Sequence, residues 1–163
     1  MKNSNYQSML ACVLRIILGS VFVFSGFVKA IDPLGTVYKI EDYLTAFGGF
    51  FNLFMPMAGV IAGVLIAEEF ALGVMLLLNV FTKWVKWLTL VFYICMTILT
   101  LYIAIENPVS DCGCFGDAIV ISNWETFWKN VILLLCAILL VSCKRYRQQF
   151  FVWPIELAIL CIS

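Results

Sequence analysis

Long apolar runs, in which charged residues are rare, constrain this chain more than any other feature. Residues 9–28 carry one charge, Arg15, and residues 87–105 carry none. A helix needs about 20 apolar residues to cross the hydrocarbon core of a bilayer. The chain of 163 residues is 64% hydrophobic and 12% charged, whereas soluble domains are about 25% charged. The sequence therefore predicts an all-α integral membrane protein.

Two further runs complete a predicted bundle of four transmembrane helices. Residues 50–80 form one, and residues 124–143 reach spanning length if Lys129 extends its amine to the interface. Residues 150–163 are apolar but too short to span. We interpret them as the start of a fifth transmembrane helix in a truncated chain, or alternatively as an interfacial tail. The four-helix membrane domain then covers residues 1–149.

A short amphipathic helix is predicted between the first two spans. Asp32-Pro33 ends the first helix. Apolar residues then recur at spacings of three and four, with charged residues between them. This pattern is typical of a helix that lies in the membrane interface. Its apolar positions are Val37, Ile40, Leu44 and Phe47.

The distribution of basic residues predicts the topology. If the four helices alternate in direction, the N-terminus, the turn between the second and third spans and the segment after the fourth span lie on one side of the membrane. These three segments carry basic residues and no acidic ones, and the positive-inside rule places them in the cytoplasm. The N-terminus is then cytoplasmic, and the loop before the fourth helix faces the periplasm of a bacterial inner membrane. The net charge of zero gives no indication of nucleic acid binding. The basic residues of the three predicted cytoplasmic segments are Lys2, Lys83, Lys86, Lys144, Arg145 and Arg147.

The periplasmic loop carries the motif most informative about function. Cys112 and Cys114 are separated only by Gly113, and a disulfide between them would close a small, strained ring. Strain makes a disulfide easier to reduce, which suits thiol–disulfide exchange. Gly116 allows the loop to turn. Flanking Asp111 and Asp117 would raise the thiol pKa values and could serve in proton transfer.

Two other interpretations of the pair remain open. It could be a structural disulfide, as many extracytoplasmic cysteines are. It could also bind Cu(I) or Zn(II) with Asp111 or Asp117, but two thiolates are too few for a closed zinc site and the chain has no histidine. No metal is therefore predicted. The remaining cysteines lie in apolar segments and are expected to be small buried hydrophobes: Cys12, Cys95, Cys136, Cys143 and Cys161.

Charges within the apolar runs are costly and are functional candidates by default. Arg15 and Glu69 have similar predicted depths, so we expect them to form a buried pair, either as a structural clamp or for proton or ligand handling. Glu68 is a further candidate. Glycines in the first two spans are expected to permit close helix approach: Gly19, Gly26, Gly59, Gly63 and Gly73.

Several short motifs occur in a fixed order along residues 14–143: Arg15-x3-Gly19-x6-Gly26-x2-Lys29-x2-Asp32-Pro33, Ile40-x2-Tyr43, Glu69-x3-Gly73, Thr82-Lys83 and Asp111-Cys112-Gly113-Cys114-Phe115-Gly116-Asp117. Together they resemble the DoxX-like membrane proteins, and within them the methylamine-utilisation MauE type. The resemblance implies a four-helix membrane fold linked to disulfide formation or maturation of periplasmic proteins. DoxX-like relatives are tied to thiol or thiosulfate oxidation coupled to quinone, and longer relatives carry an extracytoplasmic thioredoxin-like domain.

The predicted function is thiol–disulfide exchange with a periplasmic thioredoxin-like partner, with Cys112 and Cys114 as the reacting pair. The resemblance implies a quinone as the acceptor of electrons, although the sequence shows no quinone motif. One alternative is a non-enzymatic membrane scaffold with a structural disulfide. Another is a small-solute transporter that uses Arg15 and Glu69.

Overall fold

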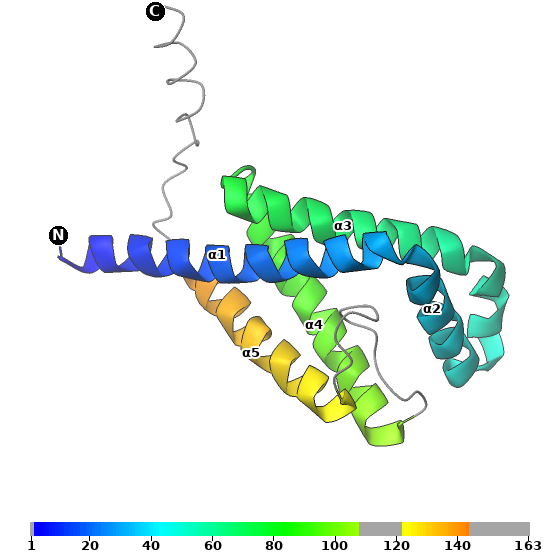
Figure 1. Ribbon diagram of the computed structural model, residues 1–163. Coiled ribbons are helices and arrows are strands. Elements are labelled where there is room, and N and C mark those ends of the chain that lie inside the picture. The colour runs from blue at the N-terminus through cyan, green and yellow to red at the C-terminus, as the bar shows by residue number, and fades with distance from the viewer. Residues whose placement is uncertain (1, 108–121, 144–163) are drawn as a thin grey trace, which may run out of the picture.

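The computed structural model describes residues 2–107 and 122–143, and it contains helices and no strand in these ranges (Figure 1). The predicted all-α bundle with four apolar spans is confirmed. The proposed start of a fifth span at 150–163 and the cysteine motif at 111–117 lie outside the described residues. The elements are α1 (Lys2–Ile31), α2 (Pro33–Phe47), the 3-10 helix η1 (Gly49–Met57), α3 (Ala58–Leu78), α4 (Thr82–Glu106) and α5 (Asn123–Ser142).

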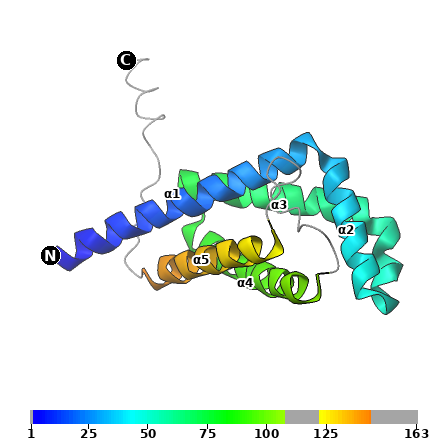
Figure 2. The ribbon, with the colours of Figure 1, turned by 60° about the horizontal axis from the view of Figure 1, so that its bottom comes forward.

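The spans form two antiparallel pairs, α1 with α3 and α4 with α5, and α1 also packs on α5. Both ribbon views show α2 leaving the end of α1 at a steep angle (Figures 1 and 2). The main core lies where the two pairs meet, around Phe22 of α1, whose ring centroid is 5.0 Å from those of Phe92 and Tyr93 in α4. The second predicted run, 50–80, is divided, because η1 occupies its first part and contains Pro56.

Glycines set the close approach of α1 and α3. A Cβ at Gly73 would lie 2.6 Å from the backbone nitrogen of Val23, and one at Gly26 would lie 2.8 Å from that of Phe70. Gly19 similarly faces Leu77. The prediction of close approach is confirmed at these three glycines. It is wrong for Gly59 and Gly63, where an added Cβ would meet nothing within 4 Å. At Gly63 a pocket lined also by Phe27 and Ala30 separates α3 from α1.

The predicted amphipathic helix is α2. Its N-cap is Asp32, whose carboxylate accepts a hydrogen bond from the Gly35 N–H at 3.1 Å, and Pro33 occupies the first turn, where its missing N–H costs nothing. Ile40 and Leu44 are buried against the start of α3. This packing fixes α2 at one end of the bundle; its location in the membrane interface stays a prediction.

Candidate functional site

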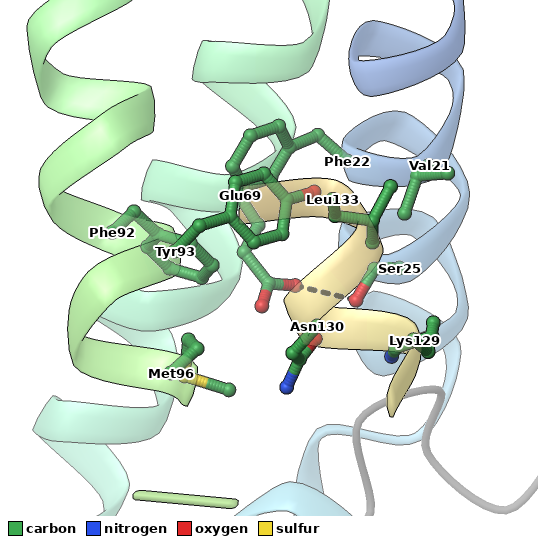
Figure 3. Close-up of a pocket in the computed structure, with 10 residues that line it drawn as sticks. All are labelled: Val21, Phe22, Ser25, Glu69, Phe92, Tyr93, Met96, Lys129, Asn130 and Leu133. Carbon is green, nitrogen blue, oxygen red and sulfur yellow. Dashed lines mark hydrogen bonds between the residues drawn. The ribbon is translucent and has the colours of Figure 1, made fainter. Parts of the chain in front are cut away.

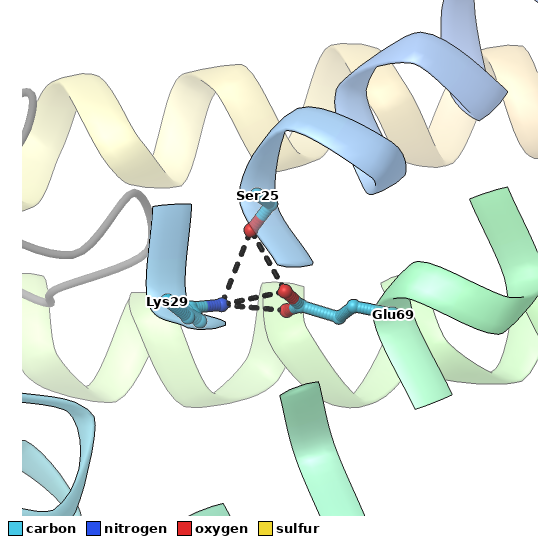
Figure 4. A network of polar contacts seen from close by, with 3 residues as sticks. All are labelled: Ser25, Lys29 and Glu69. Atoms are coloured by element: carbon cyan, nitrogen blue, oxygen red, sulfur yellow. Dashed lines mark hydrogen bonds and ion pairs between the residues drawn. The ribbon is translucent and has the colours of Figure 1, made fainter. Parts of the chain in front are cut away.

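A buried polar cluster joins α1 to α3 (Figure 4). Lys29 Nζ lies 2.7 Å from Glu69 Oε1 and 2.8 Å from Oε2. The Ser25 hydroxyl donates to Glu69 Oε2 at 2.8 Å, and Lys29 Nζ donates to Ser25 Oγ at 3.2 Å. Both charged side chains are 3% exposed. The carboxylate is therefore paired and hydrogen-bonded, as a charge removed from water must be.

Local sequence explains how the cluster forms. Ser25 and Lys29 are four residues apart, so they lie one above the other on the same face of α1. Gly26 lies between them, and its missing side chain lets the backbone of α3 approach at Phe70. Glu69 is thereby brought opposite both polar residues of α1.

The predicted pairing of Arg15 with Glu69 is wrong. Arg15 precedes Ser25 by ten residues, which corresponds to about 15 Å along a helix axis. It lines a small pocket with Asn79 and Lys86, beside the C-terminal end of α3, where carbonyl groups and the helix dipole favour a cation. The prediction failed because it estimated the depth of each residue from the ends of the apolar runs. The actual register of α1 against α3 is fixed by the contact between Gly19 and Gly73.

The two adjacent glutamates have different surroundings. Glu69 is buried, whereas Glu68 is exposed on the outer face of α3, because successive residues of an α-helix point about 100° apart. Glu68 therefore does not join the cluster. Of the candidates in the apolar runs, only Glu69 takes part, and its cationic partner is Lys29, which the family resemblance included.

A small pocket of about 20 Å³ adjoins Glu69 (Figure 3). A water molecule needs about 10–15 Å³ by this measure, so the pocket has room for one. Its polar lining includes Ser25, Lys129 and Asn130. Asn130 is 3% exposed and its side-chain amide donates to Thr100 Oγ1 at 3.2 Å. Sequence reasoning missed Ser25 and Asn130; their sequence signal is a small polar residue within an otherwise apolar helical face.

Two helix ends flank the connection that carries the cysteine motif. Asn107 ends α4 in a left-handed conformation with φ 48°, and its side-chain oxygen accepts a hydrogen bond from the Asn123 amide at 2.8 Å. Ser122 starts α5 with a capping box, in which its hydroxyl and backbone exchange hydrogen bonds with Glu125. Both ends of the connection are thus fixed and held together.

The cysteines of the described segments are free thiols. Cys143 is buried, as predicted, and Cys12 and Cys136 are half-buried. The prediction of burial is wrong for Cys95, which is exposed on the outer face of α4. Within the described segments, no group of three or more cysteine, aspartate or glutamate side chains is arranged to hold a metal ion.

Comparison with known proteins adds one finding. A family model described as methylamine utilisation protein MauE matches residues 7–143, a range that contains nearly all of α1 and every later helix of the described chain. Neither a curated protein nor a solved structure matches.

Proposed function

The chain belongs to the MauE family, and we propose that this multi-pass membrane protein is a thiol–disulfide redox protein whose reacting groups are Cys112 and Cys114. The proposal places it in the bacterial inner membrane with the cysteine pair in the periplasm. Its partner would be a periplasmic thioredoxin-like dithiol, either a separate protein or a further part of the same chain.

The observation that carries the proposal is the hydrogen bond between Asn107 and Asn123. It fixes the two helix ends from which the cysteine-bearing connection leaves and returns. A redox pair that meets a protein partner benefits from such a fixed base, because less freedom is lost on docking. The same end of the bundle carries the C-terminal part of α1 and all of α2, since α1 and α4 both run toward it (Figure 2).

The exchange can be written with electrons balanced. A thiolate of the partner attacks one sulfur of the Cys112–Cys114 disulfide, forms a mixed disulfide and releases the other cysteine as a thiolate. The partner's second thiol then attacks the mixed disulfide. The partner leaves oxidised, and the cysteine pair has gained two electrons and two protons. Its re-oxidation requires a two-electron acceptor, for which the family resemblance points to a lipid-soluble quinone.

The Lys29–Glu69 pair supports this function by holding α1 on α3. Both carboxylate oxygens of Glu69 accept hydrogen bonds from residues of α1, which is the arrangement expected of a structural contact between the two helices. The transporter alternative depended on a site formed by Arg15 and Glu69, and that site is not formed. The remaining rival is a scaffold subunit whose cysteines only brace the loop.

Trapping of the mixed disulfide tests the proposal. Cys112→Ser and Cys114→Ser variants should each be made, since either sulfur could be the one attacked, and one of them should accumulate a covalent adduct that reductant dissolves. Cys95→Ser is the matched control, because this thiol is exposed on α4 but precedes Asn107 by twelve residues, about 18 Å along a helix axis; it should form no adduct. If neither loop variant traps a partner, and the native pair resists mild reductant, the scaffold interpretation replaces the redox one.

A further inference from the structure

A second, larger cavity lies between α2, α3 and α4. Its volume is about 290 Å³, and nearly all of its lining is apolar. Ligand pockets in proteins begin at about 300 Å³, and an apolar cavity of about 150 Å³ already stays dry and binds benzene. The walls are formed by Ile40 and Leu44 of α2, Ile61 and Leu65 of α3, and Leu99 and Ile103 of α4.

Aromatic side chains of α2 pack on α4 and hold α2 beside this cavity. The ring of Phe47 stacks on that of Tyr102 with centroids 4.9 Å apart, and Tyr43 packs against Ile103. These contacts join the far end of α2 to α4. At its near end, Asp32 caps α2 and its N–H donates to the Val28 carbonyl of α1 at 3.3 Å. The cavity is therefore a built feature of the helix packing.

One polar atom in the lining lacks a hydrogen-bond partner. Thr36 is 6% exposed, and its Oγ1 has no partner within the described chain. The other polar groups whose contacts are defined are engaged: Lys29 holds Glu69, and the Thr100 hydroxyl donates to the Met96 carbonyl at 2.7 Å. A buried hydroxyl without a partner is costly, and beside an apolar cavity it marks the place where a ligand oxygen would bind.

We propose that this cavity binds a lipophilic molecule whose polar end carries an oxygen that accepts a hydrogen bond from Thr36. Its apolar body lies between α2, α3 and α4. Lys39 also lines the cavity and favours an oxygen with full or partial negative charge. Two sources share this chemistry, a single-chain fatty acid and a lipid-soluble quinone. The inference does not depend on the cysteine pair.

Photo-crosslinking of the purified full chain tests the site. A palmitic acid carrying a diazirine should label peptides of α2, α3 and α4 saturably, and decanoic acid or a decyl-substituted benzoquinone should compete. Competition by decanoic acid alone identifies the fatty-acid source, and competition by the quinone alone identifies the quinone; competition by both supports a site for the shared chemistry. Labelling that is not saturable, or that falls on other helices, overturns the proposal.

Two variants separate binding from folding. Thr36→Val should weaken the binding of the competing ligand about five- to tenfold, the loss expected for one hydrogen bond. The ligand-free variant should unfold at the same temperature as the native protein or at a higher one. Thr89→Val is the matched control, because Thr89 is likewise buried with an unpartnered hydroxyl but does not line the cavity. Equal competition in all three proteins would refute the role of Thr36. A double Cys112→Ser/Cys114→Ser variant should bind as well as the native chain, which separates this test from that of the redox function.

Discussion

Lys29 Nζ and Glu69 Oε1 lie 2.7 Å apart, with both side chains 3% exposed. They belong to different spans, and their contact is an ion pair that joins α1 to α3. A buried pair of this kind contributes little net stability compared with apolar residues of similar volume, but removal of one partner leaves an uncompensated charge. The pair therefore fixes the register of α1 on α3 more than it adds to the stability of the bundle.

Single and double replacements of this pair should differ sharply. Lys29→Met alone or Glu69→Leu alone should each destabilise the protein by about 3–5 kcal/mol, because the remaining charge is buried without its partner. The double variant should recover most of that loss. Thermal unfolding of the detergent-purified protein and its accumulation in membranes measure both effects.

Arg15 provides the control for this prediction. Glu69→Gln combined with Arg15→Gln should be no more stable than Glu69→Gln alone, since Arg15 lies beside the end of α3 and not beside Glu69. Recovery of stability through Arg15 would contradict the pairing described above and would restore the pair expected from the sequence.

The glycine contacts predict a contrast along α3. Gly73→Ala should destabilise the bundle by about 1–3 kcal/mol, because the added methyl group meets the backbone of Val23 and overpacked sites cost roughly that much. Gly63→Ala should be neutral or slightly stabilising, since it meets nothing within 4 Å and alanine is the better helix former. Unfolding temperatures of the two variants, measured side by side, check this. Equal effects would show that α1 does not approach α3 at Gly73.

The sequence predicts each element of this fold better than it predicts how the elements meet. Apolar length identifies the spans, and Asp32-Pro33 with the period of Ile40 and Leu44 identifies α2, because these signals are local. The partner of Glu69 depends on the register of two helices, which the contact between Gly19 and Gly73 sets. That contact joins positions far apart in the chain, so no local pattern reveals it.

The cap of α5 should matter for stability near the cysteine connection. Ser122→Ala should cost about 0.5–2 kcal/mol, because the Ser122 hydroxyl accepts a hydrogen bond from the Glu125 N–H at the helix start. Ser142→Ala is the control, since that exposed hydroxyl only donates to the Ile138 carbonyl within the same helix. Hydrogen exchange of the first turn of α5 provides the measurement. Unchanged protection in Ser122→Ala would mean that the capping box does not hold this end.

Thiol labelling in intact cells should determine which side of the membrane each end of α4 faces. Lys83 begins and Glu106 ends a span of 24 residues, and a helix of that length extends about 36 Å, longer than the roughly 30 Å hydrocarbon core. This length suffices to span the core, so we expect the two ends to lie on opposite sides of the membrane. After mild reduction, a membrane-impermeant reagent should label Cys112 and Cys114, which follow Glu106 in the sequence, without permeabilisation.

The opposite end of α4 supplies the control. In a chain without the loop cysteines, Lys83→Cys should be labelled only after the membrane is permeabilised, because the basic residues near the start of α4 favour the cytoplasm. Cys95 should stay unlabelled in both conditions, since it lies near the middle of the span on its outer face. The reverse pattern, with Lys83→Cys accessible in intact cells, would place the cysteine loop in the cytoplasm. There disulfides are kept reduced, and the proposed exchange with a periplasmic dithiol could not occur.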